Sequence, residues 1–144
     1  MHQGVPRFLE QRKALLEGIG FAQYQKRQSK KIPILFVIID NYGSFRRMSG
    51  DAYEELIEKI AGEGLNYGIY LVMTALGAGG SEIPSKLFEK IKTTMALELS
   101  DRVMYGDVLR RYRIGILPKE GCKGRGLIKS EEEIMEMQVP VFSE

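Results

Sequence analysis

The chain of 144 residues is 44% hydrophobic and 28% charged, a composition that fits one globular domain or a large piece of one. Its 21 basic and 19 acidic residues leave a net charge of +2, too small to indicate binding to nucleic acid or to an anionic membrane. The single cysteine, Cys122, excludes an internal disulfide, and no apolar run approaches the roughly 20 residues that span a bilayer.

The N-terminal segment, residues 1–31, predicts a helix followed by a basic loop. Its apolar residues recur near helical spacing, at Phe8, Leu15, Leu16 and Ile19. Gly18 or Gly20 is a natural stop for this helix. Residues 22–31, AQYQKRQSKK, are polar and basic, and they predict a solvated loop or a ragged helix end.

Strand and helix patterns alternate in residues 32–144. The apolar run ILFVII, residues 34–39, suits a strand buried on both faces. Residues 51–65 predict an amphipathic helix capped by Asp51 or Ser49. The remaining predicted elements are a strand at 67–76, a short helix at 81–92, a strand at 93–99, a helix at 101–112 capped by Ser100 or Asp101, and short strands ending at 129 and spanning 133–142. This alternation predicts a parallel sheet with right-handed crossovers.

Asp40 directly follows the strand of residues 34–39. A buried carboxylate is unfavourable, so we expect Asp40 at the carboxyl end of the strand, where open α/β sheets bind ligands. It could cap the loop, accept a phosphoryl group as in a receiver domain, or be the acid of a Walker B strand that holds Mg²⁺. The receiver is excluded because it needs earlier paired acids and a lysine after a later strand, where this chain has Glu98 and Leu99.

Four sequence blocks resemble the FtsK/SpoIIIE family of RecA-like motor ATPases, in that family's order and spacing. They are PILFVIIDNYGSFR, GEGLNYGIYLVMTAL, KTTMALELSDRVMYGDVL and GRGLI, and the resemblance runs from Ile32 to Val141. Within the family they look most like the degenerate ATPase domains of the EssC/EccC group of type VII secretion ATPases.

The resemblance implies an α/β fold, a RecA-like P-loop NTPase core of three layers with a mostly parallel sheet. No G-x-x-x-x-G-K-(S/T) phosphate loop occurs in the sequence, and in the family that loop lies upstream of the matching blocks. Residues 1–144 are therefore expected to form a single partial domain without the Walker A half, with residues 32–144 as its Walker B half.

The resemblance also assigns roles to four residues at the strand ends. Asp40 and Asn41 take the Walker B position, where Asp40 would contribute indirectly to Mg²⁺ binding. Asn41 stands where active members carry the glutamate that polarises the attacking water, and an amide cannot accept that proton. Thr74 and Leu76 fall at the sensor-like position, and Leu76 replaces a polar residue that is usually glutamine.

Two arginines are candidate interface residues. Arg46 could face a neighbouring domain or a nucleotide, although a solvated position is the commoner one for a surface arginine. Arg125 lies between Gly124 and Gly126 and matches the family's GRG hairpin, where the glycines let the backbone approach its neighbour closely. Structural and contact-making roles both stay open for Arg125.

The function that the resemblance implies is that of a degenerate nucleotide-binding or regulatory domain of a type VII secretion motor. Such a domain couples ATP state and recognition of secreted helical-hairpin substrates to protein export. ATP and Mg²⁺ are expected as cofactors of the complete domain and not of this chain alone, which is expected to be inactive even if its parent protein is an ATPase. The expected location is the cytoplasmic face of a bacterial membrane, with the membrane anchor outside this chain.

Other ATPase domains of the same polypeptide are the expected partners, together with the secreted substrates and a second copy of the chain; DNA is not expected. Two alternatives stay open. The first is a fragment of a DNA-translocating motor, which is expected to carry glutamate at 41, glutamine at 76 and a more basic surface. The second is an interaction scaffold that never binds nucleotide. A missing first half should also bare part of the apolar face of residues 34–39, unless the helix around Leu15 and Leu16 covers it.

Overall fold

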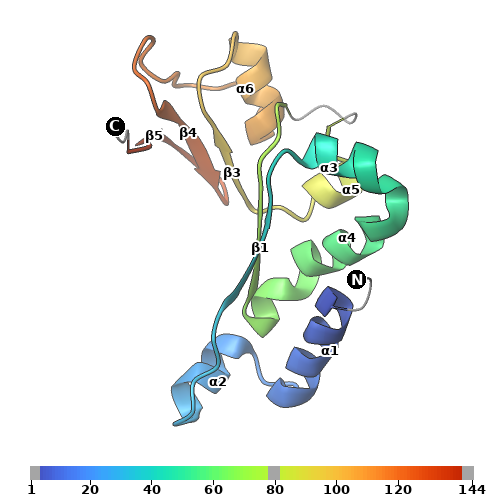
Figure 1. Ribbon diagram of the computed structural model, residues 1–144. Helices are drawn as coiled ribbons and strands as arrows, with labels where there is room; N and C mark the ends of the chain where they lie inside the picture. The colour runs from blue at the N-terminus through green and yellow to red at the C-terminus, as the bar shows by residue number, and fades with distance from the viewer. Residues whose placement is uncertain (1–3, 78–81, 141–144) are drawn as a thin grey trace.

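The computed structural model describes residues 4–77 and 82–140, which form two sheets with helices packed against them (Figure 1). The helices are α1 (Gly4–Leu16), α2 (Phe21–Arg27), α3 (Tyr42–Ser49), α4 (Glu54–Glu63), α5 (Ser85–Phe88) and α6 (Arg102–Leu109), with 3-10 turns η1 (Gly50–Tyr53) and η2 (Gly64–Tyr67) on either side of α4. The strands are β1 (Leu35–Ile39), β2 (Ile69–Met73), β3 (Thr93–Ala96), β4 (Arg125–Ser130) and β5 (Glu133–Gln138). No helix among the described residues is long and apolar enough to cross a membrane.

The strands form a parallel pair and an antiparallel meander. In the parallel pair, Leu35 of β1 lies opposite Ile69 of β2, and Ile39 lies opposite Met73. The second sheet has the order β3-β4-β5, with both pairings antiparallel. Only residues 131–132 separate β4 from β5, whereas a parallel connection needs a crossover of about a dozen residues or more. The α/β architecture is as expected, but only one of the two described sheets is parallel, and the other is antiparallel.

One face of the β1–β2 pair is packed beneath α1 and α4. Leu9 of α1, Ile60 of α4 and Ile69 of β2 form a buried cluster. The inward-facing residues of the two strands pack against this cluster: Leu35, Val37 and Leu71. Figure 1 shows α1 and α4 on the same side of β1. This helical layer buries the inward half of the parallel pair.

Arg12 fixes α1 in place. Its side chain is 5% exposed, and its guanidinium donates to the carbonyl of Pro33 at 2.5 Å and to that of Tyr67 at 3.4 Å. These bonds join α1 to the chain just before β1 and to η2. Lys13 adds an ion pair with Glu63 at 2.7 Å. The helix is therefore docked by polar contacts as well as by its apolar face.

For the segment after α1 the sequence predicts a solvated loop or a ragged helix end, and the structure has a separate helix there. Residues 21–27 form α2, whose buried Phe21 packs beside Gly68 just before β2. Gly68 has a φ of 71°, and a Cβ there would lie 2.5 Å from the ring of Phe21. Glycine is required at this position both by the backbone angle and by the approach of the ring.

Residues 42–49 form α3, a helix that the sequence did not predict. The helix expected from residue 51 begins at Glu54, and neither expected cap holds it. The hydroxyl of Ser49 donates instead to the carbonyl of Phe45, within α3. The expected cap of α6 is confirmed, because Asp101 accepts a hydrogen bond from the backbone N–H of Met104 at 2.9 Å.

The second sheet has its own core beneath α6. Ala96 of β3 and Leu127 of β4 are buried against Tyr105 and Leu109 of α6 and against Ile114. These strand positions share one face of the sheet, because Ala96 lies opposite Leu127 in the ladder. Each of the two sheets is thus covered on one face by helices of its own.

The outward face of β1 is bare. The expectation that residues 34–39 are buried on both faces is wrong, because Phe36 is 57% and Ile38 69% exposed. Leu16 of α1 is fully buried, but Leu15 is 48% exposed, and α1 covers only the inward face. An apolar run shows that a strand is suited to double burial, and it does not supply the second covering layer.

The docking of α1 can be tested with neighbouring leucines. Leu9→Ala should lower the free energy of unfolding by about 2–5 kcal/mol, because the removed side chain is fully packed. Leu15→Ala, in the same helix, should lower it by less than about 1 kcal/mol because its side chain is half exposed. Urea unfolding of both variants measures the difference. Equal losses would mean that α1 does not dock through Leu9.

Candidate functional site

The carboxyl ends of β1 and β2 are joined by a cluster of hydrogen bonds. The hydroxyl of Thr74 donates to Asp40 Oδ1 at 2.5 Å and accepts from the N–H of Asn41 at 2.8 Å. The backbone of Thr74 adds two bonds, from its own N–H to the carbonyl of Ile39 and from the N–H of Tyr42 to its carbonyl. We call this cluster the strand-end clamp. It fixes the direction of the Asp40 carboxylate at an exposed edge of the sheet.

Asn41 begins α3. Its backbone is left-handed, with a φ of 52°, and its side-chain oxygen accepts a hydrogen bond from the N–H of Ser44 at 3.1 Å. Asparagine is among the residues that tolerate this conformation and cap helices well. A glutamate at this position would be strained and would lose the cap. The structure therefore gives Asn41 a local role that does not depend on catalysis.

The clamp offers oxygen atoms, the ligands that Mg²⁺ prefers. They are the carboxylate of Asp40 and the hydroxyl of Thr74. Within residues 4–77 and 82–140, no group of three or more His, Cys, Asp or Glu side chains could hold a metal ion. The clamp therefore fits an ion that is held mainly by phosphate and water, with Asp40 contributing one anion, and it does not fit a metal centre built from protein ligands alone.

The structure separates the two residues of the expected sensor position. Thr74 bonds directly to Asp40, whereas the side chain of Leu76 is 78% exposed. Leu76 has no polar group with which to orient water. The segment GAGGSE that follows it, residues 77–82, lies mostly outside the described residues.

A second carboxylate, which sequence reasoning missed, lies beside the first turn of α3. The side chain of Glu82 packs directly against Gly43, where any Cβ would collide with it. Its Oε2 atom is buried and has no hydrogen-bond partner in the part of the chain that the structure describes. An acid is favoured electrostatically near a helix N-terminus. In the sequence, the glycine at position 43, between an aromatic and a polar residue, is the one sign that another group approaches the chain closely here.

Tyr42, the first residue of α3, is 1% exposed and belongs to the core that includes Ile39 and Ile57. Burial raises the pKa of its phenol, and the negative charge of Glu54 adds to the rise. The phenol is therefore neutral at physiological pH. Its burial anchors the start of α3 next to the clamp.

The two candidate interface arginines lie in different parts of the structure, one on a helix beside the parallel pair and one in the antiparallel sheet. Arg46 lies on α3 and pairs with Glu54 of α4 at 3.1 Å, which links these helices. Arg125 begins β4 and lies 3.6 Å from Glu136 of β5. Each arginine therefore has a partner within the chain. A contact with another domain stays a prediction for both.

The glycines around Arg125 serve the second sheet. Gly124 has a φ of 77°, and a Cβ there would lie 2.7 Å from the carbonyl oxygen of Val139. A Cβ on Gly126 would collide with the carbonyl oxygen of Ala96 in β3. The GRG sequence thus lets β4 lie close to both of its neighbours.

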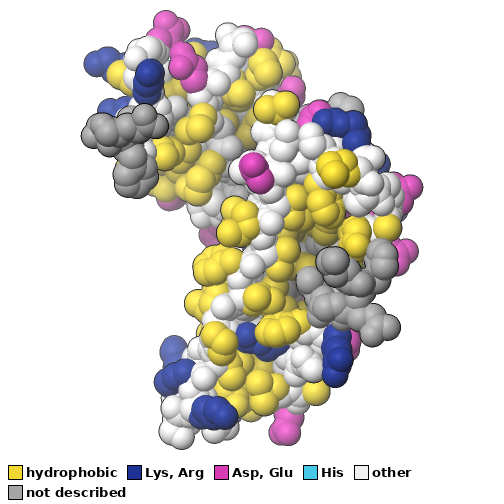
Figure 2. Space-filling model, viewed as in Figure 1, with side chains coloured by type: hydrophobic (Ala, Val, Ile, Leu, Met, Phe, Trp, Pro, Cys, Tyr) yellow, Lys and Arg dark blue, Asp and Glu magenta, His cyan; other side chains and the backbone are white. Residues whose placement is uncertain are grey.

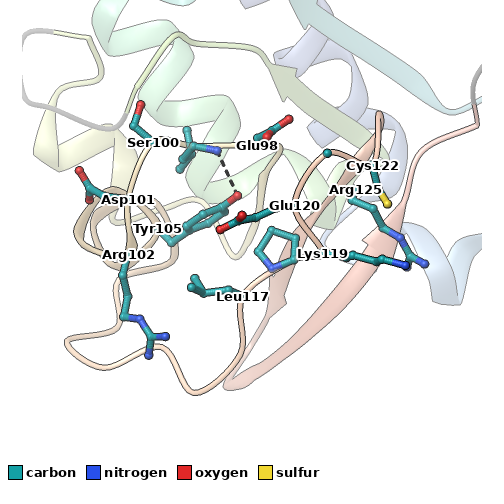
Figure 3. A pocket seen from close by; sticks show the side chains of 13 residues that line it. Glu98, Ser100, Asp101, Arg102, Tyr105, Leu117, Lys119, Glu120, Cys122 and Arg125 are labelled. Carbon is teal, nitrogen blue, oxygen red and sulfur yellow. Dashed lines mark hydrogen bonds between the residues drawn. The ribbon is translucent and has the colours of Figure 1, made fainter.

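Arg125 also borders a cleft of 540 Å³ between α6 and the loop that precedes β4 (Figure 3). Among its lining residues, the hydroxyl of Tyr105 accepts a hydrogen bond from the N–H of Leu99 at 3.0 Å. Its charged lining residues are balanced: Glu98, Asp101 and Glu120 against Arg102, Lys119 and Arg125. In Figure 3 the side chains of Lys119 and Arg125 extend together, away from Ser100 and Asp101. The cleft has no excess of positive charge for phosphate and belongs to a different sheet from Asp40.

Comparison with known proteins identifies relatives of this chain, although no family model matches it. The type VII secretion system protein EssC of Staphylococcus aureus strain MRSA252 is 32% identical over 127 residues, which are 85% of this chain. The chain is homologous to a segment of EssC. EssC of strain Mu50 is 23% identical over 116 residues. The chain spans only 8% of the length of either relative.

Solved structures show the same fold. EssC (ATPases 2 and 3) from Geobacillus thermodenitrificans aligns with 88% of this chain at a TM-score of 0.69 and 24% identity, and the match is 23% of that chain. The cytoplasmic domain of the Thermomonospora curvata type VII secretion ATPase EccC aligns with 99% at 0.74 and 16% identity, over 18% of that chain. The conjugation coupling protein TcpA of pCW3, solved with ATPγS, aligns with 90% at 0.74 and 18% identity, over 40% of that chain. The expected RecA-like ATPase fold is thereby confirmed.

The strand-end clamp can be tested at Thr74. Thr74→Val removes a hydroxyl that both donates and accepts, so the free energy of unfolding should fall by about 1–2 kcal/mol. Thr74→Ser should recover most of this loss because it keeps the hydroxyl. Thr93→Val, at an exposed strand position outside the clamp, is the matched control and should be nearly neutral. A neutral Thr74→Val would show that the clamp does not hold the strand ends.

Proposed function

We propose that this chain forms part of a degenerate nucleotide-binding domain in a type VII secretion motor. The observation that carries the proposal is the strand-end clamp, in which Asp40 is held at the carboxyl edge of a parallel strand pair next to Asn41. That is where an acid can act on the magnesium of a bound nucleotide. Homology to EssC supports the secretion setting.

ATP and Mg²⁺ are the proposed cofactors of the complete domain. Bound Mg²⁺ supplies charge neutralisation at the phosphates, and Asp40 would hold its hydration shell from the protein side. The amide of Asn41 is engaged with Ser44 and cannot act as a general base. Leu76 offers no polar contact to a phosphate. Such a domain would keep its nucleotide rather than turn it over.

The regulatory role follows from what the clamp touches. Asn41 bonds to Thr74 and at the same time caps α3, and α3 is joined to α4 by the ion pair of Arg46 with Glu54. A change at Asp40 on nucleotide binding would reach α4 through these contacts. We propose that the domain thereby couples ATP state and recognition of secreted helical hairpins to neighbouring ATPase domains of the same polypeptide, at the cytoplasmic face of the membrane.

The proposal is tested in a chimera in which this chain replaces the matching 127-residue region of EssC from strain MRSA252. Asp40→Ala should weaken Mg²⁺-dependent binding of a fluorescent ATP analogue about tenfold or more, because an anion near the cation is lost. Asp51→Ala removes an exposed acid of η1 and is the matched control. Equal affinity of both variants would contradict a nucleotide role for Asp40, and no binding at all by the parent chimera would favour the interaction scaffold.

The same chimera tests whether the site has lost the ability to hydrolyse ATP. Asn41→Glu should raise phosphate release little, because Leu76 stays apolar and catalytic groups act as a unit. The variant should also unfold more easily, since it loses the cap of α3 and places glutamate at a positive φ. Hydrolysis of several ATP molecules per minute by this single variant would show that Asn41 alone prevents catalysis.

A further inference from the structure

We infer that the loop at the end of α2, residues 26–31, binds the surface of an anionic membrane. We call it the basic loop: its sequence KRQSKK has four basic residues in six positions. That the loop works near a membrane rests on the proposed function. Its affinity for an anionic surface rests only on the charges and the packing of the described residues.

Acidic residues are absent from the sequence around the basic loop. No Asp or Glu lies between Glu17 and Asp40, so the bases have no counter-charge close by in the chain. The net charge of +2 averages over the whole chain and does not describe this segregation. The local potential depends on where the charges lie, and here it is positive.

The bases of the loop are exposed, and three of them lack an acidic partner. Lys26, Arg27 and Lys30 make no ion pair within residues 4–77 and 82–140. By contrast, Lys13 of α1 is paired with Glu63 at 2.7 Å. The charge of the basic loop is therefore available to a partner outside the chain.

Gln25 closes the basic loop. Its side-chain nitrogen donates to the carbonyl of Ile32 at 2.6 Å, and its side-chain oxygen accepts from the N–H of Ile32 at 3.1 Å. The Nζ of Lys31 also donates to the carbonyl of Gln25. In Figure 1, α2 lies at the end of the molecule that is remote from the β3–β5 sheet, and Figure 2 shows Lys and Arg side chains gathered at that end. The bases are thus presented together on a closed, projecting loop.

A role confined to the helix accounts for only half of the cluster. Lys26 and Arg27 lie in the last turn of α2, where the helix dipole favours a base. Lys30 and Lys31 lie beyond the helix, so the dipole gives no reason for them.

The composition of the loop favours a membrane over a protein or a nucleic acid. Residues 25–31 include no apolar or aromatic side chain, the kind that anchors a protein interface. The aromatic residues of α2 are Phe21, which is buried, and Tyr24, which is half-buried, so neither ring is presented to stack on a base. An anionic membrane is a diffuse layer of charge and needs neither contact.

The size of the cluster sets the expected strength. Clusters of about four to eight bases respond to the negative surface of a membrane, and each base near that surface strengthens binding about fivefold. Four bases correspond to half-binding near about 1 mM lipid. This is too weak to recruit the chain from solution, but it can orient a domain that is already held close to the membrane.

The test is cosedimentation of the full 144-residue chain with lipid vesicles, without nucleotide. Vesicles of phosphatidylcholine and phosphatidylglycerol in equal parts should bind half of the chain near about 1 mM lipid, and phosphatidylcholine alone should bind little. Raising NaCl from about 0.1 M to about 1 M should release the chain, because the Debye length falls from about 10 Å to about 3 Å. The triple variant Lys26→Gln/Arg27→Gln/Lys30→Gln should bind about a hundredfold more weakly.

A matched control removes the same charge elsewhere. Lys86→Gln/Lys92→Gln/Lys123→Gln changes three exposed bases outside the basic loop and should bind like the parent. Equal weakening by the two triple variants would overturn the inference, because net charge and not the loop would then determine binding.

Two further results would also overturn the inference. Equal binding to both kinds of vesicle would show adsorption through apolar surface instead of charge. Tighter binding of a single-stranded oligonucleotide or of polyglutamate than of anionic vesicles, lost in the loop variant, would replace the membrane by that class of partner.

This outcome is separable from that of the proposed function, because the vesicles are tested without nucleotide. Vesicle binding by the chain together with no ATP binding by the chimera leaves the role of the loop intact and removes the nucleotide role. ATP binding by the chimera together with no binding of the chain to anionic vesicles removes the inference alone.

Discussion

The rest of this structure depends on one constraint. Among the described residues, helices cover only one face of the parallel pair β1–β2. α1 and α4 seal the inward face of β1 and β2 through Leu9, Ile60 and Ile69, and Arg12 secures α1 through backbone carbonyls. The outward face, centred on Ile38, has no such layer among the described residues. Parallel sheets usually have both faces covered, so the exposed outward face is the unusual feature of this strand pair.

The strand-end clamp lies at the carboxyl ends of the same two strands, where the proposed function places a nucleotide. Thr74 holds Asp40 at the open edge, and Asn41 turns the chain directly into α3. Four hydrogen bonds hold the clamp together, and each joins Thr74 to one of residues 39–42 at the end of β1. A rigid acid followed by a capping amide suits the retention of a nucleotide, whereas hydrolysis would need a base at position 41. The same contacts give a route from Asp40 to α4, which a regulatory domain requires.

Sequence reasoning located the clamp because long apolar runs mark β1 and β2, and Asp40 and Thr74 follow those runs directly. It missed α3, since residues 42–49 contain glycine, serine and two arginines and show no apolar period. That helix forms because Asn41 caps it and Tyr42 is buried at its start, and both facts depend on tertiary contacts. The antiparallel meander was missed for a similar reason, because strand patterns do not specify the direction of pairing. The spacing of apolar residues also does not tell which apolar face of a strand is packed against helices.

The central claim is that Asp40, held by the strand-end clamp, acts on the magnesium of a nucleotide bound by the complete domain. Hydrogen–deuterium exchange of the EssC chimera, with and without ATP and Mg²⁺, tests it most directly. The account predicts slower exchange with ATP and Mg²⁺ at residues 40–49, because the nucleotide would lie beside Asp40 and α3 begins there, and unchanged exchange in β5. Unchanged exchange at residues 40–49 under conditions in which the chimera binds ATP would contradict it.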